Sequence, residues 1–265
     1  MQAVADNLTK LQRSKRIKLL RALSRFRLHT VKPIAIFRHS PGEGAGYFAH
    51  FLNAHGIPWV LVRLDAGDTV PPDVSPYSGF CFMGGPMSVN DDLPWIPPAL
   101  ALIKQAVSWG IPTLGHCLGG QLISKALGGT VTSNDTKEIG WGNVAVTPSK
   151  DAEEWFGHST HFTSFHWHGE TFSLPRGAMH LLSSQWCANQ AYVLDGRHLA
   201  MQCHVEMTEE MVRAWAAEGA PEIASSPGPG VQESATILDW MGNKLPALTA
   251  VASRLYSRWS ERLPR

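Results

Sequence analysis

The sequence contains few cysteines, and their spacing is not that of a disulfide framework or a zinc site. Four cysteines occur among its 265 residues, and no two of them form a C-x-x-C pair. Paired, regularly spaced cysteines are typical of disulfide-rich secreted domains and of zinc sites, so neither is expected here. We therefore expect four free thiols, at Cys81, Cys117, Cys187 and Cys203.

Long apolar runs are missing as well. No stretch approaches the ~20 apolar residues that a membrane-spanning helix needs, and the N-terminus lacks the apolar segment of a secretory signal. These absences predict a cytoplasmic protein with no membrane span. Hydrophobic residues make up 44% and charged residues 17% of the chain. This is ordinary globular usage, so we expect one α/β domain with extensions.

Patterns for metal and nucleotide binding are also absent, although the chain has 12 histidines. The densest group has no helical i, i+4 pair and no cysteine partner, and it comprises His158, His161, His166 and His168. We interpret these as surface or structural histidines and predict no metal site. No phosphate-binding loop of the form G-x-x-x-x-G-K occurs. A reaction step that needs a nucleotide is therefore expected to take place on another protein.

The formal net charge of +1 is unevenly distributed. Residues 1–29 carry eight Lys or Arg and one Asp, a local charge of +7, which leaves −6 for the remainder. Leucines recur there at roughly helical spacing, so residues 1–30 are predicted to form a basic helical arm. A solvated or self-packing helix is the favoured interpretation, and an acidic partner, a membrane surface and organelle targeting are the alternatives. No nucleic-acid partner is expected.

From Pro33 onward, short apolar runs alternate with helical patterns. Strands are predicted at 34–37, 59–64, 80–83 and 112–116, and helices at 47–54, 97–109 and 118–127. This βαβ rhythm predicts an α/β fold with a mainly parallel, doubly wound, flavodoxin-like sheet and helices on both faces. Functional groups are expected to gather at the strand ends.

The pattern changes after residue 130. Additional short strands are predicted at 144–146, 164–168, 179–182, 190–194 and 199–204, before a helix that begins near Thr208. Residues 221–230 are rich in Pro, Gly and Ser, and residues 231–259 resume a helical pattern. We therefore expect a main domain over residues 31–220, followed by a linker and a C-terminal helical extension over residues 221–265.

The strongest local signal is Gly115-His116-Cys117-Leu118-Gly119, which lies between a predicted strand and a predicted helix. Small residues on both sides allow the sharp turn of a nucleophile elbow, with the sulfur of Cys117 at the N-terminus of the helix. The helix dipole and unpaired N–H groups stabilise a thiolate at that position. A cysteine nucleophile is therefore expected, with a buried core cysteine as the minor alternative.

A base for this nucleophile is available at the end of the last predicted strand. His204 and Glu206 are separated by one residue, so both side chains would share a strand face. Glu206 would then orient the His204 ring and stabilise its charged form. Gly84-Gly85-Pro86 offers backbone N–H groups that, with that of Leu118, could form an oxyanion hole, or could make an ordinary strand-exit turn.

Four ordered blocks extend these signals into a resemblance to a family. They are Phe82-Met83-Gly84-Gly85-Pro86, residues 115–121 (GHCLGGQ), residues 166–172 (HWHGETF) and residues 202–206 (QCHVE). Residues 34–206 resemble class I glutamine amidotransferase domains, most closely a stand-alone branch similar to the glutaminase portion of GMP synthetase and to γ-glutamyl peptidases.

This resemblance implies roles for ten residues. The catalytic triad matches Cys117, His204 and Glu206, the oxyanion-hole amides match Gly85 and Leu118, and the substrate-binding positions match Gly84, Gln121, Trp167, His168 and Gly169. The chain departs from the family pattern at His116, Cys203 and Val205, which replace an aliphatic residue, an aromatic residue and a proline. None of these departures removes a reacting group.

The expected function is a cysteine amidase that hydrolyses the γ-carboxamide of glutamine, or a γ-glutamyl bond, through a γ-glutamyl thioester. Neither a metal nor an organic cofactor is expected. One alternative is an ammonia-donating glutaminase subunit of a separate synthetase. The other is a catalytically idle binding or stress protein on the same fold. The expected partners are the small-molecule substrate and either a synthetase or a second copy of the chain.

Overall fold

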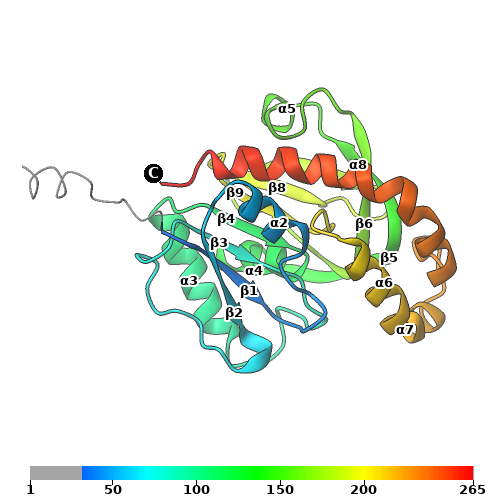
Figure 1. Ribbon diagram of the computed structural model, residues 1–265, viewed down its shortest axis with the longest axis horizontal. Helices are drawn as coiled ribbons and strands as arrows, with labels where there is room; N and C mark the ends of the chain where they lie inside the picture. Colours follow the sequence, from blue (N-terminus) through cyan, green and yellow to red (C-terminus); the bar gives the residue numbers. More distant parts are fainter. Residues whose placement is uncertain (1–31, 265) are drawn as a thin grey trace, which may run out of the picture. The chain divides into compact units, whose positions relative to one another are not determined.

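A nine-stranded sheet runs through residues 32–264, the part of the chain that the computed structural model describes (Figure 1). Its strand order is β2-β1-β3-β4-β9-β8-β7-β5-β6. The basic arm predicted for residues 1–30 lies outside the described residues. This sheet confirms the α/β fold class that the sequence predicts.

One half of the sheet is parallel. It consists of β1 (Ile34–Arg38), β2 (Trp59–Arg63), β3 (Gly79–Phe82), β4 (Thr113–His116) and β9 (His198–Met201). Neighbouring strands in this half pair in parallel, as the βαβ rhythm predicts. A short 3₁₀ helix, η1 (Leu64–Ala66), follows β2.

The other half is antiparallel and extends the sheet from β9. It contains β5 (Val131–Val146), β6 (His161–Phe172), β7 (Met179–Ser184) and β8 (Ala191–Leu194). The predicted strands at 144–146 and 164–168 were too short, because β5 and β6 form one long hairpin-like ladder. Exposed polar residues in the first part of β5 hide that ladder from a search for apolar runs.

Helices cover both faces of the parallel half because its strands are apolar on both sides. In β1, Ile34 and Ile36 belong to one hydrophobic cluster, and Ala35 and Phe37 belong to another. The first cluster lies under α2 (Gly46–Ala54) and α8 (Ser234–Ser260). The second lies under α3 (Ile96–Ser108) and α4 (Leu118–Ala126). The sheet is therefore doubly wound, as predicted.

The C-terminal helix α8 forms where residues 231–259 predict a helix, and it runs along the face that also carries α2 (Figure 1). Tyr256 and Trp259 are fully buried, and their rings contact the Phe48 ring of α2 at centroid distances of 4.7 and 5.7 Å. No helix within residues 32–264 combines the length and apolar character that crossing a bilayer requires.

Three further helices complete the described chain. They are α5 (Lys150–Phe156), α6 (Glu209–Glu218) and α7 (Ala220–Ser225). The helix expected near Thr208 forms as α6, and the Thr208 side chain caps it by accepting a hydrogen bond from the Met211 amide. The predicted linker begins too early, because Pro221 lies in the first turn of α7, where proline is well tolerated.

The last predicted strand, 199–204, extends too far. Strand β9 ends at Met201, so His204 and Glu206 lie in the irregular segment that follows it. His204 makes only an isolated bridge to Phe165 of β6, in which its amide donates to the Phe165 carbonyl at 2.8 Å. The shared strand face that the i, i+2 spacing predicts is therefore wrong as an explanation of how the two side chains meet.

Candidate active site

Cys117 lies in a sharp turn between β4 and α4, as the elbow pattern predicts. Its φ of 49° is in the left-handed region that costs a non-glycine residue roughly 1–2 kcal/mol. Glycines on both sides make the turn possible. A methyl group on Gly119 would collide with the Phe82 carbonyl oxygen, and one on Gly115 would collide with the Gly119 backbone. The strain is therefore held by close backbone packing of β3, β4 and α4.

His204 and Glu206 meet despite lying beyond β9. The His204 Nδ1 is 2.6 Å from the Glu206 Oε1, and each side chain is 1% exposed. The first turn of α2 fixes this segment, because the Tyr47 amide donates to the Glu206 carbonyl at 2.7 Å. The Trp215 ring packs at right angles to the imidazole with a centroid distance of 4.9 Å. Both side chains are therefore held by tertiary contacts.

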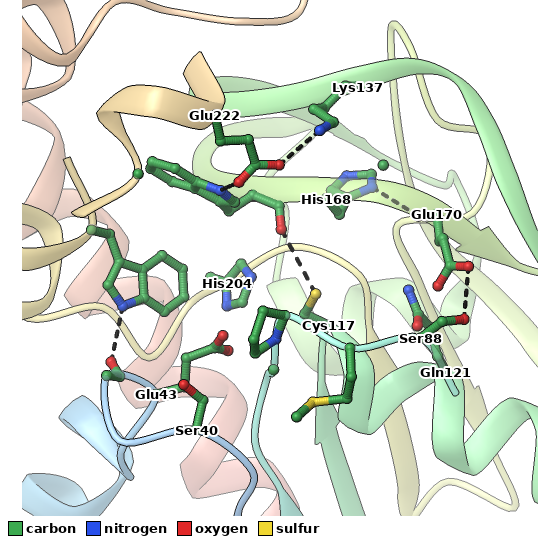
Figure 2. A pocket seen from close by; sticks show the side chains of 18 of the residues that line it. Ser40, Glu43, Ser88, Cys117, Gln121, Lys137, His168, Glu170, His204 and Glu222 are labelled. Atoms are coloured by element: carbon green, nitrogen blue, oxygen red, sulfur yellow. Dashed lines mark hydrogen bonds and ion pairs between the residues drawn. The ribbon is translucent and has the colours of Figure 1, made fainter. Parts of the chain in front are cut away.

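The free nitrogen of His204 is available to the thiol. A carboxylate only accepts hydrogen bonds, so Nδ1 carries the proton and Nε2 has no partner among residues 32–264. Figure 2 shows the His204 ring beside the Cys117 sulfur. The Cys117 sulfur also lies 3.9 Å from the Trp167 carbonyl oxygen and 3.5 Å from the Gln202 Nε2. This arrangement suits transfer of the thiol proton to Nε2.

The pKa values of His204 and Glu206 are shifted in directions that favour their charged forms. Burial disfavours the imidazolium form, but the charge of Glu206 and the neighbouring Cys117 raise the pKa of His204 well above its ordinary value. Burial likewise disfavours ionised Glu206, but His116 and His204 lower the pKa of Glu206 to about 2. The carboxylate is therefore ionised at neutral pH and can stabilise an imidazolium.

Gly85 and Leu118 lie next to each other beside the elbow. A methyl group on Gly85 would approach the Leu118 Cδ2 to 2.7 Å. Leu118 is the first residue of α4, so its amide has no intrahelical acceptor. In the described part of the chain, no acceptor takes a hydrogen bond from the Gly85 amide. Two amides are thus free for an oxyanion, and their role as an oxyanion hole remains a proposal.

A cavity of 590 Å³ opens over Cys117 and His204 (Figure 2). Seven of the ten residues predicted from the sequence line it: Gly85, Cys117, Gln121, Trp167, His168, Gly169 and His204. The other three, Gly84, Leu118 and Glu206, are not among its lining residues. Gly84 packs against the imidazole, since a methyl group there would come within 3.2 Å of the His204 Cε1.

Two of the predicted substrate-binding residues are tied to neighbouring polar groups. Gln121 donates to the Gln202 Oε1 at 3.2 Å, which links it through Gln202 to the Cys117 sulfur. The Trp167 indole N–H donates to the Glu222 Oε2 at 2.8 Å. Their side chains are therefore preorganised at the cavity wall, and their substrate-binding role stays a prediction.

Sequence reasoning missed the acidic side chains of the cavity, which are Glu43, Glu170, Glu218 and Glu222. Lys137 also lines it and pairs with Glu222 at 2.7 Å. Burial raises the pKa of Glu43 to about 7, so this carboxyl is poised to titrate near neutrality beside His204. Glu43 follows β1, and a search of every loop at the carboxyl end of a parallel strand would have found it. No comparable signal marks the glutamates of α6 and α7.

The three departures from the family pattern are all buried. His116 Nε2 lies 3.7 Å from the Glu206 Oε2 and 3.1 Å from the Tyr256 hydroxyl of α8. Burial lowers the pKa of His116, and the charge of Glu206 opposes this effect. Cys203 and Val205 are fully buried on either side of His204. His116 thus lies between the Glu206 carboxylate and the Tyr256 hydroxyl of the C-terminal helix.

Comparisons with known proteins identify one family. The family model described as glutamine amidotransferase class-I matches residues 48–214. The crystal structure of a glutamine amido transferase from Methylobacillus flagellatus superposes on this structure with a TM-score of 0.86. The match covers 89% of this chain and 96% of that chain, with 44% sequence identity. The glutamine amidotransferase-like protein YfeJ from Salmonella typhimurium is 29% identical over 196 residues, 72% of this chain and 82% of YfeJ.

Two further kinds of relative match over shorter lengths. Gamma-glutamyl peptidase 4 from Arabidopsis thaliana is 27% identical over 174 residues, 62% of this chain and 68% of the peptidase. A GMP synthase from Lacticaseibacillus casei is 31% identical over 139 residues, which are 49% of this chain but only 24% of the synthase. The sequence match, the fold and the cysteine elbow lead to one conclusion: the chain belongs to the class I glutamine amidotransferase family.

Proposed function

We propose that this protein is a free-standing cysteine amidase that hydrolyses γ-glutamyl compounds, with Cys117 as nucleophile, His204 as base and Glu206 as the group that orients the base. The observation that carries the proposal is the strained Cys117 elbow beside the free Nε2 of a histidine whose Nδ1 is held by Glu206. The strained backbone of Cys117 and the buried charge of Glu206 both reduce the stability of the fold. Because both lie at the same site, a shared catalytic role explains why they are retained.

The proposed reaction has two steps. The Cys117 thiolate attacks the γ-carbonyl carbon of the substrate, and the amides of Gly85 and Leu118 stabilise the oxyanion. The His204 imidazolium then protonates the departing amine, which leaves a γ-glutamyl thioester. Water attacks the thioester with its proton passing to His204, and glutamate leaves as the thiolate and imidazolium are restored. Residues of this chain suffice for each step.

The cavity favours a substrate larger than glutamine. Its volume of 590 Å³ is in the range that proteins use for drug-sized ligands, whereas glutamine has about ten non-hydrogen atoms. The similarity to γ-glutamyl peptidase 4 points the same way. We therefore propose γ-glutamyl peptides as the substrate class.

The test is glutamate release by the purified protein from γ-glutamyl dipeptides and from glutamine, with Cys117→Ala as the control. We expect cleavage of the peptides at least as efficient as that of glutamine, and loss of both activities in the variant. The similarity to GMP synthase favours a rival, in which the chain donates ammonia to a synthetase. Inertness towards peptides, with glutaminase activity only in the presence of a synthetase, would replace our proposal by that rival.

A further inference from the structure

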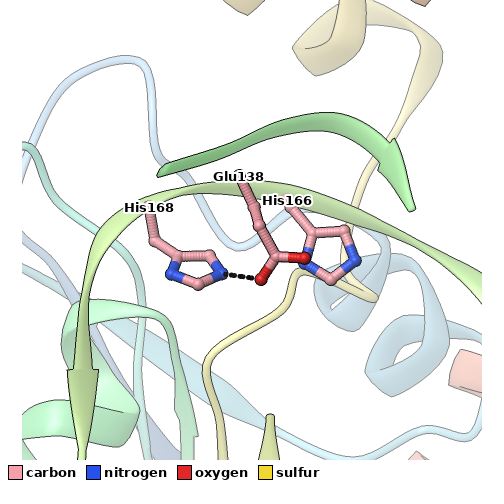
Figure 3. Close-up of side chains that lie close together, drawn as sticks. All are labelled: Glu138, His166 and His168. Atoms are coloured by element: carbon pink, nitrogen blue, oxygen red, sulfur yellow. Dashed lines mark ion pairs between the residues drawn. The ribbon is translucent and has the colours of Figure 1, made fainter. Parts of the chain in front are cut away.

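Beside the amidase cavity, β5 and β6 bring three potential metal ligands together (Figure 3). Glu138 of β5 pairs directly with His168 of β6, and His166 lies two residues earlier on the same face of β6. All three residues are buried. One carboxylate oxygen and one ring nitrogen from each histidine all lie within 4.8 Å of one another.

In each histidine, the ring nitrogen that points away from the cluster contacts a backbone carbonyl oxygen. His168 Nδ1 lies 3.0 Å from the Glu170 carbonyl oxygen, and His166 Nε2 lies 3.4 Å from the Gly142 carbonyl oxygen. A carbonyl oxygen only accepts, so in a ring with a single proton these nitrogens carry it. The lone pairs of His168 Nε2 and His166 Nδ1 then face the cluster. Metal-binding histidines almost always have this arrangement.

The contact between His168 and Glu138 needs a positive charge. His168 Nε2 lies 3.1 Å from the Glu138 Oε2. With the ring proton on Nδ1, the lone pair of Nε2 would face a carboxylate oxygen, and two acceptors repel each other at that distance. Either a second proton on the ring or a cation between the two atoms removes the repulsion.

The amide nitrogen of Gln190 is likewise surrounded by more acceptor atoms than it has hydrogens. Its Nε2 lies 2.7 Å from the Glu138 Oε2, 3.4 Å from the His166 Nδ1, 3.3 Å from the His168 Nε2 and 3.2 Å from the Ser184 Oγ. An amide nitrogen has two hydrogens, so it cannot satisfy all of these atoms. The Gln190 Oε1 has no partner among residues 32–264, although the side chain is fully buried. Rotation of the amide would turn this oxygen towards the cluster.

We propose that Glu138, His166 and His168 bind one divalent transition-metal ion, with the Gln190 amide oxygen as a fourth ligand. Two imidazoles and a carboxylate suit ions such as Zn²⁺ or Fe²⁺, whereas Mg²⁺ and Ca²⁺ prefer oxygen ligands throughout. A neighbouring cavity of 230 Å³, lined by Glu138 and His166, gives the ion a route from solvent.

This proposal departs from the sequence expectation that no metal site exists. The i, i+2 spacing of the histidines matches no common zinc motif, and their carboxylate partner is 28 or more positions away. The expected role of the ion is structural. His168 and its neighbours Trp167 and Gly169 line the amidase cavity, so an ion behind them would fix that wall. The proposal does not depend on the amidase reaction.

The test is metal binding by the full-length Cys117→Ala protein, in which the thiol of the amidase site cannot bind the ion. After chelator treatment and dialysis, Zn²⁺ is titrated by calorimetry, and Co²⁺ provides a visible spectrum that reports its ligands. We expect one Zn²⁺ per chain, a rise in Tm with Zn²⁺, and Co²⁺ bands of nitrogen and oxygen ligands without thiolate charge transfer.

Two ligand variants and one control locate the site. Glu138→Gln and His166→Ala, each in the Cys117→Ala background, are expected to bind Zn²⁺ about 100-fold more weakly, or not at all. His158→Ala removes an exposed histidine that pairs with Glu153, and it should bind normally. No one-to-one Zn²⁺ binding by the folded Cys117→Ala protein would overturn the proposal, whatever the other variants do. Undiminished binding in both ligand variants would also overturn it, because the ion would then be elsewhere.

Discussion

Replacing Glu43 by glutamine is expected to stabilise the protein at pH 8 and to change little at pH 4. Burial raises the pKa of Glu43 from 4.5 to about 7. Between these two values the folded state binds more protons than the unfolded state, so stability falls as the pH rises through this window. Glutamine does not titrate, and Glu43→Gln therefore removes this loss of stability.

The size of the effect follows from the pKa. A rise from 4.5 to about 7 corresponds to about 3 kcal/mol at about 1.4 kcal/mol per pH unit. Glu43 is half-buried at the cavity, so water relieves part of this cost, and we expect about 1–3 kcal/mol at pH 8. In a chain of this size, 1 kcal/mol shifts the Tm by about 2–4 °C.

Urea unfolding at pH 4 and pH 8 measures this difference directly. Asp239→Asn, which changes an exposed carboxylate on α8, is the matched control and should shift stability by less than about 0.5 kcal/mol at both pH values. If Glu43→Gln and the wild type keep the same difference in stability from pH 4 to pH 8, Glu43 does not carry the raised pKa.

Three further predictions concern the elbow, the base and the C-terminal helix. His204→Ala should abolish glutamate release without loss of helical circular dichroism. Glu206→Gln should retain more activity, because a group that orients the base contributes less than the base itself. Equal and complete loss of activity in both variants would contradict the assigned roles. Gly119→Ala should destabilise the protein by more than about 2 kcal/mol in urea, because the new methyl group meets the Phe82 carbonyl. Its control, Gly242→Ala on α8, has open space around the new methyl group and should stabilise by about 0.5–1 kcal/mol. Trp259→Ala should cost about 3–5 kcal/mol by the same assay, since the ring is fully buried against the sheet, and a cost below 1 kcal/mol would mean that α8 packs loosely.

The parallel half of the sheet could be predicted because its signals are local. Short apolar runs and glycine stops place its strands and helices within a few residues of their observed bounds. The Cys117 elbow follows from the same local pattern. The antiparallel half depends on pairing between distant segments, so the length of the β5–β6 ladder and the early end of β9 could not be read from apolar runs.

The site shows the same division. The residue pair His204 and Glu206 was predictable by type and spacing, but the contacts that hold it come from Tyr47 and Trp215, which are remote in sequence. Glu43 and Glu138 lie outside the four sequence blocks, and nothing in the block that contains His168 indicates its pairing with Glu138. Their proximity to other groups arises from tertiary structure alone, which single-sequence patterns do not contain.

Labelling with an electrophilic glutamine analogue that carries a diazoketone tests whether Cys117 alone among the four cysteines is the nucleophile. Burial raises the pKa values of the other thiols, strongly for Cys81, moderately for Cys187, and to about 12 for Cys203. Thiolates react and thiols do not, so these three should stay unmodified. We expect a single adduct, mapped to Cys117 by peptide mass spectrometry, with loss of glutamate release in proportion to labelling. Adducts spread over several cysteines, or full activity after complete labelling of Cys117, would contradict this expectation.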